Sequence, residues 1–482
     1  MSRFNTKTAG TRTENLAGGE AFSESPELEF ISILLTSFVQ DQFYRSADKG
    51  MERVRELILL NDKEFCAKAA IYARTQFGMR SISHVVAGEL AKQVKGKEWA
   101  KRFYDKVVYR VDDITEILSY YLSQYGKPVP NSLKKGLASA FDKFNGYQLA
   151  KYRSEGKAFS LVDAVNLLHP KPVEGNESAL KELVEGKLVS TDTWEAKLTK
   201  AGQEGEGEEA VKALKKDAWL ELIKEKKLGY FALLRNLRNI LEQAPEAIPE
   251  AIRTLTNEKL IKKSLVLPFR FVTALEQIEQ TSYPDSMNVI MALNEAVDIS
   301  LSNVPELPGK TLVVLDVSGS MTWCTDKTGR HPAKIGALFA AILVKANKAD
   351  FMSFDCQARY QTLNPMDSTL TISRNIKFTG GATNFNTPFL TANKAYDRII
   401  ILSDMQGWVG YHVPTGAFNE YKSQYNCSPF IYSVDLQGYG SLQFPERNVF
   451  CLAGFSEKIF DTMKYLEQDK RALVKEIEKV EI

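Results

Sequence analysis

The sequence is poor in cysteine and histidine, and neither residue is spaced as a metal site requires. Its 482 residues include five cysteines, none in a C-x-x-C pair, and four histidines that do not pair at ligand spacing. An odd number of scattered cysteines argues against a disulfide framework and against a thiolate zinc site. We therefore expect a protein of a reducing, cytoplasmic compartment.

Long apolar runs and an excess of one charge are also missing. The longest apolar-leaning run, at 31–39, is far shorter than the roughly 18 residues of a membrane-spanning helix. The N-terminus has no apolar segment after a basic one, so a secretory signal is not indicated. With 62 basic and 60 acidic residues, the balance excludes only a protein that is basic all over.

Helical periodicity dominates what the sequence does contain before residue 305. Asp112 and Asp113 precede an apolar stripe and can cap the first free amides of that helix. Ser160 and Asp163 have the spacing of a capping box at the start of another helix. Many short amphipathic helices are most simply accommodated as antiparallel pairs stacked in a solenoid, although the sequence shows no fixed repeat period.

Composition divides the chain into expected domains. Residues 1–25 are predicted to be a flexible segment, and a Gly- and Glu-rich stretch at 201–210 is predicted to be a solvated loop between helices. Two prolines in NVPELPGK mark a boundary after which the pattern changes. The sequence thus predicts a helical domain at 26–305 and a second domain at 306–482.

In the second domain, short β-branched and aromatic runs alternate with helical stretches. The runs are TLVVLD, ADFMSFD, RIIILSD, PFIYSVD and NVFCLAG. Such alternation predicts a doubly wound, parallel sheet, so the fold class is multidomain, α and α/β. The carboxyl ends of parallel strands share one edge of a sheet, where ligands bind, and four of the runs end in an aspartate: Asp316, Asp355, Asp404 and Asp435.

The motif directly after the first strand offers three short oxygen side chains. Asp316, Ser318 and Ser320 alternate around a glycine that permits a tight turn, and Thr383 and Asp404 are two further donors from later turns. Hydroxyl and carboxylate oxygens without Cys or His suit a hard cation such as Mg²⁺. The alternative is that these side chains only cap helices and satisfy turns.

This pattern resembles the metal-ion-dependent adhesion site (MIDAS) of von Willebrand factor A domains, over residues 310–482. The resemblance implies that Ser318 and Ser320 ligate Mg²⁺ directly, Thr383 directly or through water, and Asp316 and Asp404 largely through water. It also implies an open coordination position for an acidic group of a partner.

An enzyme is not indicated. The sequence has no G-x-S-x-G elbow, no Walker loop and no H-E-x-x-H motif. A metal-dependent hydrolase that uses the aspartate edge is a further alternative, but no general base or activated nucleophile accompanies that edge.

Charge is distributed unevenly in the helical part. Residues 80–170 contain 15 lysines and arginines against nine acidic residues, and the rest of the helical part has the opposite excess. Four tyrosines lie among these cations and could supply rings on which unpaired bases stack: Tyr104, Tyr109, Tyr147 and Tyr152. The alternative is that the cations form solvated helix faces.

Several helical stretches resemble the TROVE module of Ro60 (Ro autoantigen) proteins and their bacterial and phage relatives. They are NSLKKGLASAFDKFNGYQLAKYR, FSLVDAVNLLHPKP, TDTWEAKL and KKLGYFALLRNLRNIL. A von Willebrand A domain follows this module in that family, so the resemblance covers almost the whole chain. It implies a ring of HEAT-like helical repeats that binds structured Y RNA on a basic outer surface and the single-stranded 3′ end of misfolded RNA in a central hole.

The resemblance also indicates which residues contact RNA. Carried over by position, the Y RNA contacts fall on Lys151, Arg153 and His169. Arg235 and Arg238, three apart and hence on one helix face, are candidates for the ring interior, unless they pair with glutamates of neighbouring helices. The expected RNA-binding set is Lys134, Lys135, Lys151, Arg153, His169, Arg235 and Arg238.

The sequence therefore predicts an RNA-binding scaffold without catalysis of its own. It would hold small noncoding Y-like or misfolded RNAs for quality control or for transfer to a nuclease. By the resemblance, an exoribonuclease such as polynucleotide phosphorylase is an expected partner, tethered through RNA; we expect a monomer without DNA or membrane partners. The competing hypothesis is a protein-interaction adaptor that uses the metal site to bind an acidic partner, without RNA.

Overall fold

The structure is a computed structural model that describes residues 12–14, 20–23, 25–36, 47–152, 159–188, 194–264, 266, 268–322, 332–405, 407, 414–436, 441–442, 449–453, 463, 467 and 472–482. Within these residues, no helix is both long enough and apolar enough to cross a membrane.

Among the described residues, helices α1 to α10 pack around one apolar core. Their contacts are mostly with helices one to three places away along the chain, as in a stacked solenoid. They are α1 (Pro26–Thr36), α2 (Ala47–Leu60), α3 (Lys63–Gln76), α4 (Ser81–Leu90), α5 (Ala100–Val107), α6 (Val111–Tyr125), α7 (Asn131–Ala140), α8 (Gly146–Lys151), α9 (Leu161–Leu168) and α10 (Glu177–Val184).

A second group of helices, α11 to α17 in the described part of the chain, shares its core with one face of the sheet. The group comprises α11 (Trp194–Glu204), α12 (Glu208–Lys224), α13 (Tyr230–Gln243), α14 (Ile248–Leu255), α15 (Glu258–Ser264), α16 (Pro268–Glu279) and α17 (Ser286–Ser300). The predicted loop at 201–210 is wrong for most of its length, because α11 continues to Glu204 and α12 begins at Glu208. Glutamate favours a helix, and only the short segment between these helices, which includes Gly207 at φ 100°, makes the turn.

The capping box predicted at the start of α9 is confirmed. The Asp163 amide donates to Ser160 Oγ (3.2 Å), and the Ser160 amide donates to Asp163 Oδ2 (2.8 Å). Two of the amides at this helix start are therefore satisfied by side chains.

The α/β part contains a six-stranded sheet in the order β5-β4-β3-β6-β7-β9. The five predicted strands are confirmed as β3 (Thr311–Asp316), β4 (Asp350–Phe354), β6 (Arg398–Ser403), β7 (Phe430–Asp435) and β9 (Val449–Ala453), all mutually parallel. The antiparallel edge strand β5 (Ala358–Gln361) was not predicted, because its four residues carry no buried apolar pattern.

Helices cover this sheet on both faces, as a doubly wound fold requires. The face toward the second helical group contacts α19 (Pro332–Asn347), and the opposite face contacts α21 (Thr387–Thr391) and the apolar residues of α22 (Pro414–Tyr425). The short helices α18 (Gly319–Thr322) and α20 (Thr369–Asn375) both contact α19, and α20 also contacts α17.

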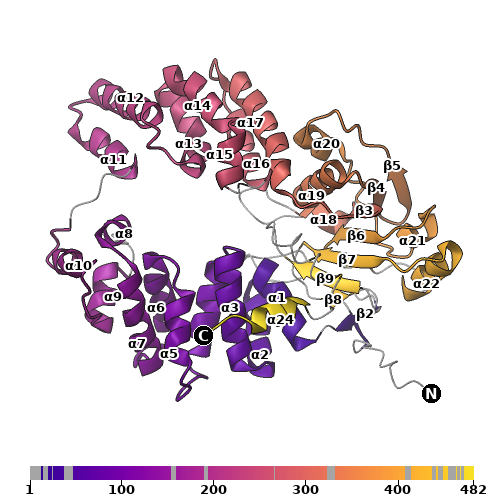
Figure 1. Cartoon of the computed structure of the whole chain (residues 1–482), viewed down its shortest axis with the longest axis horizontal. Helices are drawn as coiled ribbons and strands as arrows, with labels where there is room; N and C mark the ends of the chain where they lie inside the picture. The colour runs from indigo at the N-terminus through magenta and orange to yellow at the C-terminus, as the bar shows by residue number, and fades with distance from the viewer. Residues whose placement is uncertain are drawn as a thin grey trace.

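The chain returns to its beginning. In Figure 1 it passes from the first helical group to the second, then to the sheet, and finally to α24 (Ala472–Glu478) beside α3. Leu473, Val474 and Ile477 of α24 are buried in the core of the first group. In the segment predicted to be flexible, β1 (Arg12–Glu14) and β2 (Glu20–Ser23) pair with each other, and β2 pairs with β8 (Ser441–Leu442) of the α/β part. The domain boundaries stay a prediction, but packing crosses them at both ends.

Close packing of α5 on α7 depends on Gly136. A methyl group at this position would lie 2.4 Å from Tyr104 Cβ and 2.5 Å from the Lys101 carbonyl oxygen. We expect Gly136→Ala to destabilise the protein by about 1–3 kcal/mol, because one of the two neighbours is backbone that must shift. The matched control is Gly416→Ala in α22, where an added methyl group would have no neighbouring atom within 4 Å. Alanine also has a higher helix propensity than glycine. Thermal unfolding followed by circular dichroism measures both, and equal stability of the two variants would contradict the expectation.

Candidate metal centre and nucleic-acid interface

The predicted metal-site residues lie at the carboxyl edge of the sheet. Asp316 ends the central strand β3, and Asp404 directly follows β6, the parallel neighbour of β3. Both aspartates are fully buried, and Ser318, Ser320 and Thr383 are buried as well. The fold therefore brings the five side chains from three loops to the same edge.

Hydrogen bonds fix the first loop and its neighbours. The Ser318 amide donates to Asp316 Oδ1 (2.9 Å), and Ser403 Oγ donates to Asp316 Oδ2 (2.6 Å). The hydroxyls of Ser318 and Ser320 lie 3.3 Å apart. Ser403 was not predicted as part of the site, although its place beside Asp404 at the strand end is the signal that could have identified it.

The loop that carries Thr383 is tied to the same edge. The Gly380 amide donates to the Val317 carbonyl (3.1 Å), and the Asn384 amide donates to the Asp355 carbonyl (3.0 Å). Thr379 Oγ1 donates to Asp355 Oδ2 (2.5 Å). Asp355, recognised in the sequence only as a strand-ending aspartate, therefore supports the Thr383 loop.

The electrostatics of this edge fit a cation. Burial raises the pKa of Asp316 to about 6; hydrogen bonds from Ser318 and Ser403 oppose the shift, and the charge of Asp355 adds to it. In the described part of the chain no lysine or arginine pairs with Asp316. No group of three or more His, Cys, Asp or Glu suited to a metal occurs there either. The candidate set instead combines hydroxyls with two carboxylates, a donor set that suits Mg²⁺.

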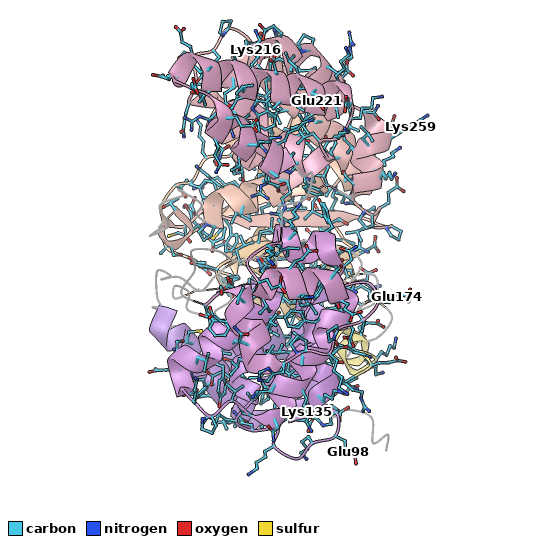
Figure 2. All side chains as sticks on the ribbon, turned by 90° about the vertical axis from the view of Figure 1, so that its left-hand side faces the viewer. Glu98, Lys135, Glu174, Lys216, Glu221 and Lys259 are labelled. Atoms are coloured by element: carbon cyan, nitrogen blue, oxygen red, sulfur yellow. The ribbon has the colours of Figure 1, made fainter. Side chains whose placement is uncertain are left out.

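The predicted RNA-binding residues of the first helical group come from adjacent helices. Lys134 and Lys135 lie on α7, Lys151 ends α8, and His169 follows α9. Lys135 is exposed at the outer surface of this group (Figure 2). His169 is exposed and adopts a left-handed conformation (φ 49°) that ends the helix, with its amide donating to the Val165 carbonyl (2.9 Å).

Lys151 is half-buried and already has partners. Its Nζ lies 3.6 Å from Glu195 Oε1 of α11 and 5.8 Å from the centroid of the Tyr152 ring. An ion pair of this length, with both side chains partly open to solvent, contributes little, so Lys151 remains able to contact a phosphate. Arg153 lies outside the described residues.

Arg235 and Arg238 are separate from this cluster. Both are exposed on α13, in the second helical group, and neither forms an ion pair with a described residue. The alternative that they pair with glutamates of neighbouring helices therefore has no support within that part of the chain. Their expected place in the ring interior stays a prediction.

A buried aspartate that the sequence identified only as a helix cap joins three segments of the first helical group. Asp113, at the first turn of α6, is fully buried and binds five groups from three segments. They are the guanidinium groups of Arg74 (2.8 Å) and Arg80 (3.2 Å), Nε2 of His84 (2.9 Å) and the amides of Tyr109 (3.0 Å) and Arg110 (2.8 Å).

This environment keeps Asp113 ionised. Burial alone would raise its pKa, but the hydrogen bond and charge of His84, the charge of Arg74 and the Arg110 amide outweigh burial, and the pKa is lowered. The cap was predictable from sequence position; its ion pairs were not, because Arg74 is 39 residues away.

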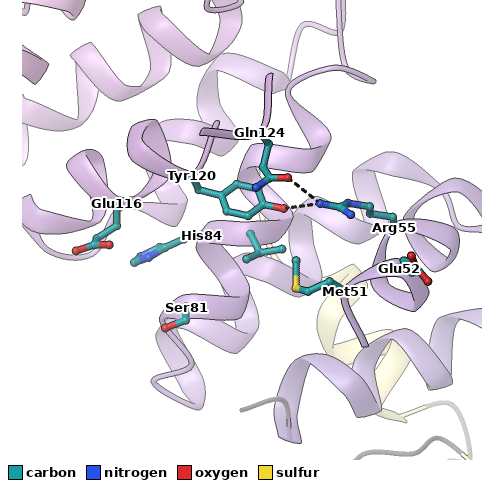
Figure 3. Close-up of a pocket in the computed structure, with 9 residues that line it drawn as sticks. Met51, Glu52, Arg55, Ser81, His84, Glu116, Tyr120 and Gln124 are labelled. Atoms are coloured by element: carbon teal, nitrogen blue, oxygen red, sulfur yellow. Dashed lines mark hydrogen bonds between the residues drawn. The ribbon is translucent and has the colours of Figure 1, made fainter. Parts of the chain in front are cut away.

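His84, which bonds to Asp113, also lines a pocket of about 610 Å³ between α2, α4 and α6 (Figure 3). Arg55 Nη2 donates to Gln124 Oε1 (3.2 Å) and to the Tyr120 hydroxyl (3.5 Å). Glu52 and Glu116 also line the pocket. Since its lining carries both charges and Arg55 is already bonded, the pocket favours no single class of ligand.

Comparison with known proteins agrees with the two-part architecture. Residues 40–196 and 185–286 match the model of the TROVE domain, and residues 310–464 match that of the Ro60 vWA domain. The RNA-binding protein RO60 of Deinococcus radiodurans is 24% identical to this chain, over 88% of this chain and 89% of the relative. Telomerase protein component 1 of Rattus norvegicus is 24% identical over 45% of this chain, which is 11% of that protein.

A solved structure has the same fold. The crystal structure of the Deinococcus radiodurans RO (RSR) protein matches with a TM-score of 0.64 and 20% identity, covering 90% of this chain and 97% of that one. The predicted fold class, a helical-repeat ring joined to a doubly wound α/β domain, is therefore confirmed. The chain belongs to the Ro60 family, with a TROVE domain followed by a von Willebrand A domain.

Proposed function

We propose that this chain is an RNA-binding scaffold. The observation that carries the proposal is the match to both Ro60-family domains in their order along the chain. The relative from Deinococcus radiodurans, RO60, is named an RNA-binding protein. The exposed Lys135 and the exposed rings of Tyr109 and Tyr147 support the proposal, because phosphate contacts and base stacking are the two sequence-tolerant means of holding RNA.

In this proposal the RNA is small and noncoding. Y-like RNA binds the basic outer surface that carries Lys135, Lys151 and His169, and single-stranded 3′ ends of misfolded RNA bind inside the ring. The chain performs no catalysis; it holds the RNA for quality control in the cytoplasm or presents it to an exoribonuclease such as polynucleotide phosphorylase, which it contacts through RNA. The scaffold acts as a monomer.

The first experiment is purification from the host at low salt. We expect RNase-sensitive nucleic acid to accompany the protein, and short RNAs with unpaired 3′ tails to bind it in a filter or anisotropy assay. A protein that carries no RNA and binds no tailed RNA would overturn the proposal.

The double variant Lys151→Ala with His169→Ala should weaken RNA binding without unfolding the protein. Loss of the Lys151 phosphate contact should lower the slope of log K against log salt by about one unit, and loss of His169 removes a hydrogen-bonding or stacking group. Titrations at several salt concentrations measure the effect. Lys259→Ala, an exposed lysine of the second helical group (Figure 2), is the matched control and should leave the slope unchanged. An unchanged slope in the double variant would remove Lys151 from the interface.

A second candidate function is an adaptor that binds an acidic protein partner through the A domain. The buried oxygen cluster around Asp316 favours it, because an ion held there by hydroxyls and water can accept a partner's carboxylate. Partner capture that requires Mg²⁺ and survives RNase treatment would distinguish this function from RNA binding.

A further inference from the structure

The structure separates the four tyrosines that the sequence grouped as possible stacking rings. Tyr104 is fully buried, and Tyr152 is half-buried. Tyr147 is 45% exposed, and Tyr109 is 64% exposed. Only the latter two can therefore offer much ring surface to a ligand, and Tyr109 is the more open.

The buried residues Asp113 and Arg74 hold Tyr109 in position. Its amide donates to Oδ2 of the buried Asp113 (3.0 Å). The guanidinium carbon of Arg74 lies over the ring, 5.2 Å from its centroid. Arg74 is itself buried and bonded to Asp113. The Tyr109 ring thus contacts a cation that is held in place by Asp113. Most of the surface of the Tyr109 side chain is nevertheless open to solvent.

Two further cations, Arg110 and Lys143, lie in or contact the segment that carries Tyr109. The Arg110 amide is held by the same Asp113 carboxylate, and the Arg110 guanidinium lies 4.4 Å from the centroid of the Tyr152 ring, which Lys151 also contacts. Lys143 Nζ donates to the carbonyl of Val108 (2.8 Å), the residue before Tyr109. Arg110 and Lys143 each also have a carboxylate partner, Asp112 (2.8 Å) and Asp105 (3.5 Å) respectively. The cations of this segment are therefore held in place by the protein itself.

We propose that Tyr109 is a stacking platform for one unpaired base of the bound RNA. This inference rests on the proposed RNA-binding function and adds to it a specific residue and a specific chemistry: a single-stranded nucleotide rather than a duplex. A ring already held in place loses little freedom when a base covers it, which favours binding.

The test uses the full-length chain and a labelled oligoadenylate of about 12 nucleotides, compared with the same backbone carrying abasic sites. Tyr109→Ala should bind the oligoadenylate about 5- to 100-fold more weakly than the unmodified chain, and Tyr109→Phe should bind within about twofold of it. All three proteins should bind the abasic strand equally. Because Tyr109 contributes little to the core, the variants should melt like the unmodified protein, and Met366→Ala, at an exposed site of the A domain, controls for loss of exposed apolar surface.

The outcomes separate this inference from the function on which it rests. If the unmodified chain binds neither strand, both the RNA-binding proposal and the platform are rejected. Should it bind RNA while Tyr109→Ala binds the oligoadenylate equally well, the platform alone is rejected. Equal weakening by Ala and Phe would also reject it, since the hydroxyl rather than the ring would then be the contact.

Discussion

Asp113→Asn should be among the most destabilising single substitutions in the first helical group. It leaves the buried guanidinium of Arg74 without a carboxylate, and Arg80 and His84 lose the same partner. Removing one member of a buried ion pair costs roughly 3–5 kcal/mol, because the remaining charge stays buried and uncompensated. We expect a loss of that size in the free energy of unfolding, measured by urea denaturation with circular dichroism.

The control is an exposed ion pair of the same kind. Glu250→Gln breaks the pair with Arg253 on α14, where both side chains are open to solvent. Its effect should stay below about 1 kcal/mol. If Asp113→Asn were as mild as Glu250→Gln, the Asp113 network would not be a significant source of stability.

The same carboxylate gives stability a pH dependence of known sign. The folded state lowers the pKa of Asp113, so its contribution is fully present above the unfolded value of about 3.9 and is lost as the pH falls toward the folded value. The unmodified protein should therefore lose stability on acidification below about pH 4 more steeply than Asp113→Asn. Parallel acid-unfolding curves would contradict this assignment.

Asp113 also connects stability to the proposed interface. It holds the amides of Tyr109 and Arg110, so its substitution should free the segment that displays both residues. We expect Asp113→Asn to weaken RNA binding even under conditions in which the variant remains folded. Since Asp113 is buried, it would act as a positioning residue rather than as an RNA contact.

Asp316→Asn should abolish stabilisation by Mg²⁺. An ion that binds only the folded state stabilises it by about 2.7 kcal/mol at a concentration 100 times Kd. The variant lacks one of the two carboxylate charges of the candidate site. Without Mg²⁺ it should melt at the same temperature as the unmodified chain or higher, because burial disfavours the charged form of Asp316.

A matched aspartate exists in the same domain. Asp397 lies at the opposite, amino end of β6 and accepts a hydrogen bond from the Lys310 amide (2.7 Å). Asp397→Asn should keep the full Mg²⁺-dependent shift. Melting temperatures measured with Mg²⁺ and with EDTA test both expectations. If Mg²⁺ does not change the melting temperature of the unmodified protein, the metal site is rejected. If Asp316→Asn keeps the Mg²⁺-dependent shift, Asp316 is not part of the site.

The sequence by itself determined what depends on residues close together along the chain. The five strands and the capping box at Ser160 follow from local patterns that repeat the geometry of a strand or a cap. The candidate metal set was also recognisable, because strand-ending residues of a parallel sheet must share an edge. Whether these side chains hold Mg²⁺ stays a prediction.

Tertiary structure alone decided which side chains from distant segments meet and which are covered. Nothing local distinguishes Tyr104, which is buried against α7, from Tyr109, which is exposed. Nor does the sequence around Asp113 show that Arg74 will reach it, or that α24 will pack on α3. Periodicity reports that one face of an element is buried, but the partner of that face depends on the packing of the whole chain.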